Sequence, residues 1–352
     1  PGRRGMDTGG LFLSLRITRA DMNFWHGRPT LITGGAGFGG AHLCQQLLQR
    51  GARIAVLDQA LPPDSYLHLA ALADRIHFIQ GDIRDADGLK LLCERFQFDT
   101  IFHCAAQPIV SISNTLPAET AAMNIMGTYN VLEAMRASRR VQRLVFASSG
   151  AYYGATSTDQ AIPEDAPPLP AANIYAPTKV AGDIAVRCYA KTYGLKAAVC
   201  RWMNTYGPGD TNFSRIVPAT IRRLLRGERP LIDGTDGTNV LEMLHVRDMA
   251  EGYIAVAERL DNPAVCGEAF NFGSGAPLTL REVAMAITRA WNEVSNDAVP
   301  QEPLITGPRV NTIKYLDITK ARRLLNWQPR ISLDDGLRET VAWYRAHRHV
   351  VL

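Results

Sequence analysis

The stretch Thr30-Leu-Ile-Thr-Gly-Gly-Ala-Gly-Phe-Gly-Gly40 joins a short apolar run, three spaced glycines and the start of an apolar helical pattern. It predicts a strand, a tight turn and the first turn of a helix. Glycines suit this turn because a Cβ at Gly34, Gly37 or Gly40 would keep the backbone away from a pyrophosphate. Such a group binds unpaired N–H groups at the positive end of a helix dipole. The stretch therefore predicts a dinucleotide site, and an ordinary strand-to-helix turn is the alternative if it is taken alone.

Two later features favour the dinucleotide interpretation. The run 53–58 has the composition of a buried strand and ends in Asp58, where a carboxylate would accept a hydrogen bond from a ribose 2′-hydroxyl. Because the same carboxylate would repel a 2′-phosphate, NAD is favoured over NADP. Further along, Tyr175-Ala-Pro-Thr-Lys179 opens a predicted helix and places a phenol and an ammonium on one helical face.

The bulk composition is that of an ordinary globular enzyme, with 352 residues, 46% hydrophobic and 20% charged. Five arginines and two aspartates in residues 1–28 account for +3 of the net charge of +4, which leaves +1 for the rest. Nucleic acid is therefore not expected as a partner. The segment 1–28 is expected to be a poorly ordered extension, and its apolar run 11–13 is too short for a membrane span.

Cysteine and histidine patterns indicate neither disulfides nor a metal. The six cysteines have no CxxC pair, and the eight histidines form no cluster with ligand spacing. We expect reduced thiols in a cytoplasmic protein with no bound metal and no membrane contact.

Short apolar strands alternate with helical patterns from residue 30 to about 150. This alternation predicts an α/β fold with a Rossmann-type, doubly wound parallel sheet, and ligand at the carboxyl ends of its strands. We expect an NAD-binding domain from 29–205 plus about 238–262. A smaller mixed α/β domain, from 206–237 plus 263–352, would bind the substrate. The predicted strands of the sheet are 31–33, 54–57, 76–80, 100–104 and 144–147.

Several candidate residues follow these strands. Asp82 would accept a hydrogen bond from the adenine amine, or would instead cap the next helix. Asn124 occupies a predicted helix, either on its surface or where Gly127 allows a close backbone approach. The full set of cofactor candidates is Gly34, Gly37, Phe38, Gly40, Asp58, Asp82, Ile83, Ala105, Asn124, Tyr175 and Lys179.

Ser149, Tyr175 and Lys179 are the candidate catalytic residues. A free tyrosine has a pKa of ~10 and is a poor base at neutral pH. A nearby ammonium and the positive charge of an oxidised nicotinamide would favour the phenolate, and a shift of about three units corresponds to roughly 4 kcal/mol. The phenolate would take a hydroxyl proton while Ser149 hydrogen-bonds the oxygen that becomes a carbonyl. For the Tyr-x-x-x-Lys spacing alone, a surface pair on a helix is the alternative.

From about 29 to 345 the chain resembles an extended short-chain dehydrogenase/reductase of the nucleotide-sugar epimerase/dehydratase branch. The resemblance implies an NAD-dependent enzyme with a transient 4-keto sugar nucleotide, and a homodimer formed through the helices near 118–138 and 175–193. It further implies substrate contacts from Gln107, Ser149, Asn204, Arg215 and Arg309. The motifs that carry it are Thr33-Gly-x-x-Gly-x-x-Gly40, Asp82-Ile83, His103-x-Ala-Ala106, Asn124, Ser148-Ser149…Tyr153-Gly154, Tyr175-x-x-x-Lys179, Arg201-x-x-Asn204-x-Tyr-Gly-Pro-Gly209 and Leu325-Asn-Trp-x-Pro329.

Departures from the family pattern narrow the reaction. The 4,6-dehydratases carry acidic residues just after the serine or threonine that matches Ser149, but this chain has Gly150 and Ala151. Related decarboxylases use a glutamate near 151, and epimerase-reductases use a cysteine near 150. What remains is a 4-epimerase that oxidises C4 of the sugar and returns hydride to the opposite face.

Other features keep alternatives open. The loop 207–218 resembles that of CDP-sugar 4,6-dehydratases, which indicates an unusual base or sugar. Leu241-Glu242 replaces an Arg-Asp pair whose arginine binds the substrate diphosphate, so Arg215 and Arg309 would take more of that role. A 4,6-dehydratase of the CDP- or GDP-sugar type, an NAD(P)-dependent sugar-nucleotide reductase and a non-catalytic nucleotide-binding protein are the alternatives. The nucleotide base and the sugar are not determined by the sequence.

Overall fold

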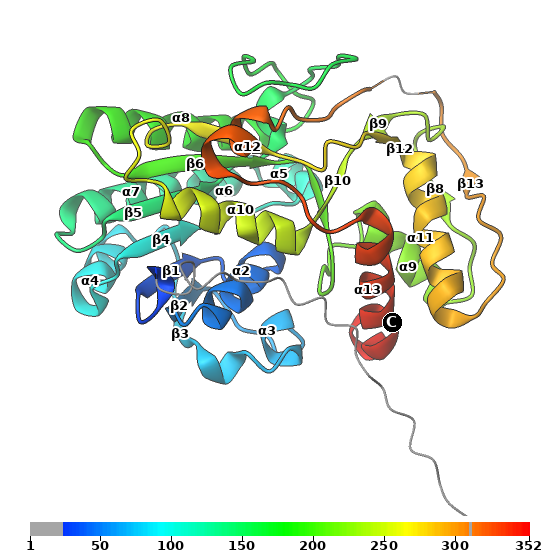
Figure 1. The fold of residues 1–352 in the computed structure, drawn as a ribbon, viewed down its shortest axis with the longest axis horizontal. Coiled ribbons are helices and arrows are strands. Elements are labelled where there is room, and N and C mark those ends of the chain that lie inside the picture. Colours follow the sequence, from blue (N-terminus) through cyan, green and yellow to red (C-terminus); the bar gives the residue numbers. More distant parts are fainter. Residues whose placement is uncertain (1–23, 310–311) are drawn as a thin grey trace, which may run out of the picture.

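A seven-stranded parallel sheet runs through the centre of the protein (Figure 1), in a computed structural model that describes residues 24–309 and 312–352. The strand order is β11-β6-β5-β4-β1-β2-β3, which is the doubly wound arrangement predicted. The seven strands are β1 (Pro29–Thr33), β2 (Arg53–Asp58), β3 (His77–Gln80), β4 (Thr100–His103), β5 (Arg143–Ala147), β6 (Ala197–Trp202) and β11 (Ala269–Phe272).

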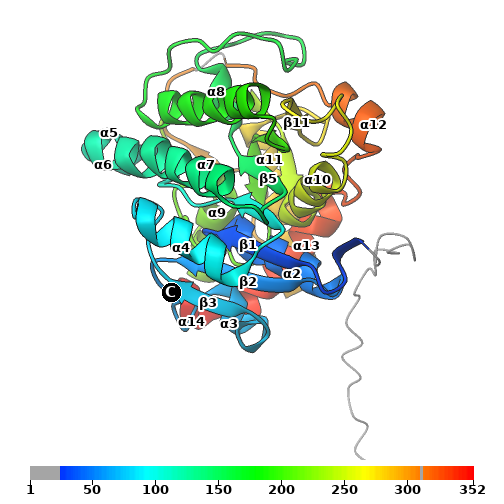
Figure 2. The ribbon, with the colours of Figure 1, turned by 90° about the vertical axis from the view of Figure 1, so that its left-hand side faces the viewer.

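Helices cover both faces of the sheet. Figure 2 shows α7 (Gly127–Ala137) and α8 (Tyr175–Tyr193) on one side and α10 (Val246–Glu258) on the other. Alternate residues of a strand point to opposite faces, so Ile32 joins the core under α10 while its neighbour Leu31 joins the core under α7 and α8. Both faces are therefore apolar, which explains why the strands were recognisable as continuous apolar runs.

The remaining helices follow the predicted pattern with local differences. Helix α3 (Tyr66–Leu69) is only one turn long and is followed by a separate 3₁₀ turn at Ala73–Arg75. Within the predicted helix 118–138 the structure has a π-helical turn, Ala122–Met126, which rotates its side chains relative to α7. These helices are α2 (Phe38–Gln49), α3 (Tyr66–Leu69), α4 (Ala86–Phe96), α5 (Val110–Thr115), α6 (Pro117–Ala121), α9 (Ile216–Leu225), α11 (Leu280–Ser295), α12 (Thr319–Leu325), α13 (Leu333–Ala346) and α14 (Arg348–Val351).

Two sheet strands were missed by the sequence analysis. Strand β6 contains Arg201 and β11 contains Asn271, and both polar side chains are fully buried. These polar residues interrupt the apolar pattern of the two strands in the sequence. They can be buried because the charge of Arg201 and the amide of Asn271 are hydrogen-bonded inside the protein. As a result β11 belongs to the central sheet, although residues 263–352 were all expected in the second domain.

The predicted extension 1–28 lies mostly outside the described residues, but 24–28 are packed against the fold. Trp25 is 0% exposed, and its indole N–H donates to Glu258 over 2.7 Å. Arg28 forms an ion pair with Asp99 at 2.5 Å. The packed fold therefore begins before residue 29.

A second, smaller apolar core is formed mainly by α9, α11 and α13. Short strand pairs accompany these helices: β8 (Leu231–Ile232) with β13 (Leu304–Ile305), and β9 (Val240–Leu241) with β12 (Leu278–Thr279). A third pair, β7 (Asn204–Tyr206) with β10 (Met243–His245), connects this unit to the main sheet. Within the described residues, no helix has the length and apolar character needed to cross a membrane.

Candidate functional site

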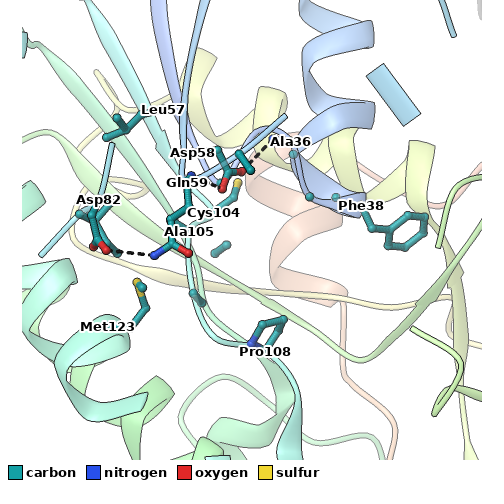
Figure 3. A pocket seen from close by; sticks show the side chains of 18 of the residues that line it. Ala36, Phe38, Leu57, Asp58, Gln59, Asp82, Cys104, Ala105, Pro108 and Met123 are labelled. Carbon is teal, nitrogen blue, oxygen red and sulfur yellow. Dashed lines mark hydrogen bonds between the residues drawn. The ribbon is translucent and has the colours of Figure 1, made fainter. Parts of the chain in front are cut away.

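The first cavity lies at the carboxyl ends of β1, β2, β3 and β4 and has a volume of about 550 Å³ (Figure 3). Eight of the eleven cofactor candidates line it. These eight are Gly34, Gly37, Phe38, Gly40, Asp58, Asp82, Ile83 and Ala105.

The glycine-rich turn between β1 and α2 has the geometry of an anion-binding loop. Gly34 has a φ of +71°, and a Cβ there would lie 2.6 Å from the backbone of Ala105. Gly37 is the N-cap of α2 without a side-chain cap, and the first helical turn has no acidic residue. The positive end of this helix is therefore open toward the cavity, which suits a phosphate group.

Asp58 lies at the carboxyl end of β2 and holds the glycine loop. Its carboxylate accepts hydrogen bonds from the backbone N–H of Ala36 at 3.0 Å and of Gln59 at 2.8 Å. Figure 3 shows it between the loop and the cavity. Burial raises its pKa, while the two backbone hydrogen bonds act in the opposite direction. This placement fits a ribose hydroxyl, which would donate to the same carboxylate.

Asp82 is paired with side chains of its own loop and of the loop after β2. It accepts hydrogen bonds from Arg84 and from Gln59, and the bonds from Arg84 lower the pKa of its carboxyl to about 2. The N-cap of α4 is Asp85, so Asp82 does not cap that helix. Of the two interpretations of Asp82, only contact with the cofactor remains a prediction.

Asn124 lies outside the lining of this cavity. It is 2% exposed within the π-helical turn, where its side chain exchanges hydrogen bonds with the backbone of Gln107 and donates to Thr178 at 3.0 Å. It therefore connects the loop after β4 to α8. The side chain of Gln107 folds back onto Ile109 and lines neither cavity.

The second cavity has a volume of about 880 Å³ and lies between the main sheet and the smaller core. Ser149, Tyr175, Asn204 and Arg215 line it, and Arg215 also lines the first cavity, so the two cavities meet there. The candidate Arg309 is exposed and is not among the lining residues. The structure thus brings together the three candidates Ser149, Tyr175 and Asn204, with Arg215 at the junction.

The catalytic candidates occupy the ends of β5 and α8. Ser149 is the N-cap of a 3₁₀ turn, Gly150–Tyr153, and its hydroxyl accepts from the backbone N–H of Ala151 at 3.1 Å. Lys179 is 4% exposed, donates to the carbonyl of Ala147 at 2.8 Å and lies 5.9 Å from the Tyr175 ring centroid. Burial lowers the pKa of Lys179 to about 8. Proline at 177 is accommodated in the first turn of α8, where no intrahelical N–H bond is lost.

Burial raises the pKa of Tyr175 to about 12, while a hydrogen bond with Ser149 and the positive charge of Arg215 act in the opposite direction. The phenol is therefore protonated at neutral pH in this state. Arg215, which the sequence suggested for phosphate binding, also places a positive charge near the phenol. A further positive charge in the site would favour the phenolate.

Residues from α10 and from the segment after β13 were missed by the sequence analysis. Met249 and Tyr253 of α10 line the first cavity, and Lys314 lines the second. No spacing signal connects them to the glycine loop, because the contacts depend on how distant segments return to the sheet. Among residues 24–309 and 312–352, no group of three or more His, Cys, Asp or Glu is placed to hold a metal ion.

The fold and the two joined cavities define a nucleotide-dependent enzyme with a dinucleotide site beside a substrate site. A family model described as the NAD dependent epimerase/dehydratase family matches residues 30–273, so the chain belongs to this family. It is 34% identical to a UDP-glucose 4-epimerase from Mycolicibacterium smegmatis, over 90% of this chain and 98% of that protein. It is also 34% identical to a dTDP-glucose 4,6-dehydratase from Streptomyces niveus, over 90% and 93% of the two chains.

Solved structures agree with this assignment. A UDP-glucose 4-epimerase from Thermotoga maritima with UDP-glucose matches with a TM-score of 0.79 and 30% identity, over 91% of this chain and 99% of that one. A dTDP-glucose 4,6-dehydratase from Streptomyces venezuelae with NAD bound matches with a TM-score of 0.77 and 30% identity, over 91% of this chain and 98% of that one. The protein is an NAD-dependent enzyme of the epimerase/dehydratase family, and its open helix start, its cavity and Asp58 fit that cofactor.

Proposed function

We propose that the enzyme is a nucleotide-sugar 4-epimerase. The observation that carries this proposal is the space beside Ser149. Gly150 has no side chain, and a Cβ there would lie 2.3 Å from the sulfur of Met203 and 3.0 Å from a backbone carbonyl, so a side chain would fit only if Met203 moved. Ala151 contributes only a methyl group to the substrate cavity. Dehydration across C5–C6 requires an acid and a base, and neither of these two positions carries a side chain that could serve as one.

The side chains that remain suit reversible oxidation of one carbinol. The Tyr175 phenolate accepts the proton of the C4 hydroxyl, and Ser149 hydrogen-bonds the same oxygen as it becomes a carbonyl. NAD, when bound at the glycine loop and Asp58, would supply reversible hydride transfer at C4. Lys179 donates a hydrogen bond to the Ala147 carbonyl, and its ammonium places a positive charge 5.9 Å from the Tyr175 ring centroid. Rotation of the 4-keto sugar before hydride return would give the C4 epimer with no net redox change.

The smaller core and the second cavity supply the substrate site in this proposal. The exposed Asn204 side chain donates to the carbonyl of Glu242 at 3.2 Å and faces the cavity that Tyr175 lines. We further propose that the unit built on α9, α11 and α13 binds the nucleotide diphosphate, with Arg215 at the junction. Leu241 lines this cavity in place of the arginine found in most of the family.

A substrate panel tests the reaction. Purified protein is incubated with UDP-, CDP-, GDP- and dTDP-hexoses and hexuronates without added reductant, and the anomeric sugar signals are followed by NMR. We expect one or more nucleotide sugars to convert to their C4 epimers with no net change in NADH absorbance. A 4-keto-6-deoxy product would identify a 4,6-dehydratase and overturn the proposal. In a parallel incubation with added NADH, stoichiometric NADH consumption would identify a reductase and also overturn it.

We also propose a homodimer formed through α7 and α8, which lie side by side in Figure 2. Large apolar side chains are exposed along these helices and the adjacent α5 and π-helical turn. Such an apolar face in water is typical of a protein interface. The exposed residues are Val110, Ile112, Leu116, Met126, Tyr129, Ile184 and Tyr193.

The substitution Ile184→Glu tests this interface. Ile184 is 44% exposed on α8, and a carboxylate there would be desolvated against the partner, which raises the dimer dissociation constant by about 100-fold or more. Light scattering after gel filtration is expected to give a dimer for the unmodified protein and a monomer for Ile184→Glu. Leu91→Glu is the matched control, since Leu91 is 64% exposed on α4. Equal masses for both variants would contradict the interface.

A further inference from the structure

Lys314 is a cation in the substrate cavity for which the described residues provide no carboxylate partner. Its ammonium donates to the carbonyl of Gly154 at 2.7 Å, and the side chain is largely withdrawn from solvent. Burial lowers its pKa. A partly desolvated ammonium with one neutral acceptor retains unused capacity to pair with an anion.

The other charged groups of this cavity each have a polar partner. Arg215 forms an ion pair with the buried Asp210 at 3.1 Å. Asp233 is the one carboxylate among the described lining residues, and it accepts a hydrogen bond from Thr306 at 2.6 Å. An anion that enters the cavity would therefore find Lys314 as the uncompensated positive charge.

The backbone position of Lys314 is fixed by hydrogen bonds of the segment on which it lies. Its backbone N–H donates to the carbonyl of Val240 at 3.0 Å, and Ile313 forms a bridge with Val240. Further along the segment, the Leu316 N–H donates to the buried Glu242 carboxylate at 2.9 Å. In Figure 1 this segment crosses from β13 to α12. The ammonium is thus held in place before a ligand arrives, which reduces the entropy lost on binding.

The ammonium lies on the side of the cavity that carries the reacting groups. Gly154 directly follows the 3₁₀ turn that begins after Ser149, and its φ is +59°. A Cβ on Gly154 would lie 1.7 Å from the carbonyl oxygen of Leu169, so the backbone here is tightly enclosed and its carbonyl direction is fixed. Lys314 therefore lines the same cavity as Ser149 and Tyr175, and a group that reaches its ammonium enters the cavity in which those residues act.

We propose that Lys314 is a specificity-determining residue that binds a carboxylate carried by the sugar, so that the substrate class is a nucleotide-linked hexuronate. This inference rests on the proposed nucleotide-sugar substrate and adds the charge of the sugar. A neutral hexose would leave the ammonium with only the Gly154 carbonyl. A hexuronate would form a charge-assisted hydrogen bond with this partly buried ammonium.

Binding of matched ligand pairs tests the assignment without requiring turnover. Calorimetric titration of the NAD-loaded protein compares UDP-glucose with UDP-glucuronate, and GDP-mannose with GDP-mannuronate. We expect tighter binding of the uronate in at least one pair. Lys314→Gln is expected to lower the affinity for that uronate by about 10- to 100-fold and to change the affinity for the matching hexose by less than about threefold. Lys314→Arg keeps the charge and is expected to retain most of the preference.

The control variant is Lys90→Gln, which removes the same charge from an exposed lysine of α4 outside both cavities. Its ligand affinities are expected to match those of the unmodified protein. If Lys314→Gln lowers the affinity for hexose and uronate ligands equally, the ammonium binds the diphosphate that both ligands share, and the inference is overturned. Absence of a uronate preference in both pairs would also overturn it. A dehydrated product with a retained uronate preference would overturn only the proposed 4-epimerisation.

Discussion

Replacement of Tyr175 by phenylalanine is expected to lower kcat by about 10²- to 10⁴-fold, which is the contribution typical of a positioned acid–base group. The ring and its packing over Lys179 are kept, so affinity for the nucleotide sugar should change little. The loss therefore reports removal of the hydroxyl that exchanges the C4 proton. Steady-state kinetics with the substrate identified by NMR, together with calorimetric binding, separates these two quantities.

The pH dependence gives a second readout of Tyr175. Burial raises the pKa of this phenol to about 12, so the base form is the minor species at neutral pH. Activity limited by the phenolate should rise as the pH increases toward the pKa of the cofactor-loaded enzyme. In Tyr175→Phe this rise should be absent from the residual activity.

Tyr152→Phe provides the matched control for the catalytic variant. Tyr152 is 6% exposed in the turn after Ser149, and its hydroxyl forms none of the hydrogen bonds found among the described residues. We expect kcat within about twofold of the unmodified enzyme, because no proton transfer is assigned to this residue. Similar losses in both tyrosine variants would contradict the specific role of Tyr175.

The substitution Arg201→Met is expected to reduce the free energy of unfolding by about 3–5 kcal/mol, the cost typical of leaving one partner of a buried ion pair uncompensated. Arg201 and Asp183 are both 0% exposed and form two hydrogen bonds, at 2.8 and 3.0 Å. Asp183 belongs to α8, which also carries Tyr175, and it accepts from Ser148 at 3.0 Å. Urea unfolding curves measure the loss.

A neighbouring arginine supplies the control for Arg201. Arg187 lies 3.9 Å from the same Asp183 carboxylate, but its side chain is 30% exposed, so Arg187→Met should cost less than about 1 kcal/mol. Adding Asp183→Asn to Arg201→Met should recover part of the loss, because the uncompensated charge is then removed. If Arg201→Met and Arg187→Met destabilise the protein equally, the buried pair does not have the assigned effect.

Local patterns were sufficient for the parts of the fold that lie close together in sequence. The strand, glycine turn and helix at 30–49 follow from adjacent residues, and α8 begins and ends at the predicted residues 175 and 193. Four of the first five strands of the sheet were recognised because both of their faces are buried and apolar, and the edge strand β3 by its apolar residues Phe78 and Ile79. By contrast, strand β6 was not recognised, because the charged Arg201 interrupts its apolar pattern. The pairing of Arg201 with Asp183, which allows the charge to be buried, exists only in the folded chain.

The residues of the candidate site also fall into two groups, those that the sequence placed correctly and those whose place depends on the folded chain. Eight cofactor candidates line one cavity because each follows a strand end, and the carboxyl ends of parallel strands meet at one edge of a sheet. Gln107 and Arg309 came from the family resemblance alone, and neither lines the substrate cavity in the structure. Asn124 connects backbone segments, a role that depends on the π-helical turn around it.

The sequence by itself determined the family, the parallel sheet and the order Ser149, Tyr175, Lys179, because these depend on motifs of contiguous residues. Only the tertiary structure decided which charges face the substrate. Lys314 is 160 residues from Gly154 in the chain, yet its ammonium reaches that carbonyl because the segment after β13 returns to pair with β9. Contacts between such distant segments are set by packing of the whole chain, which no local periodicity encodes.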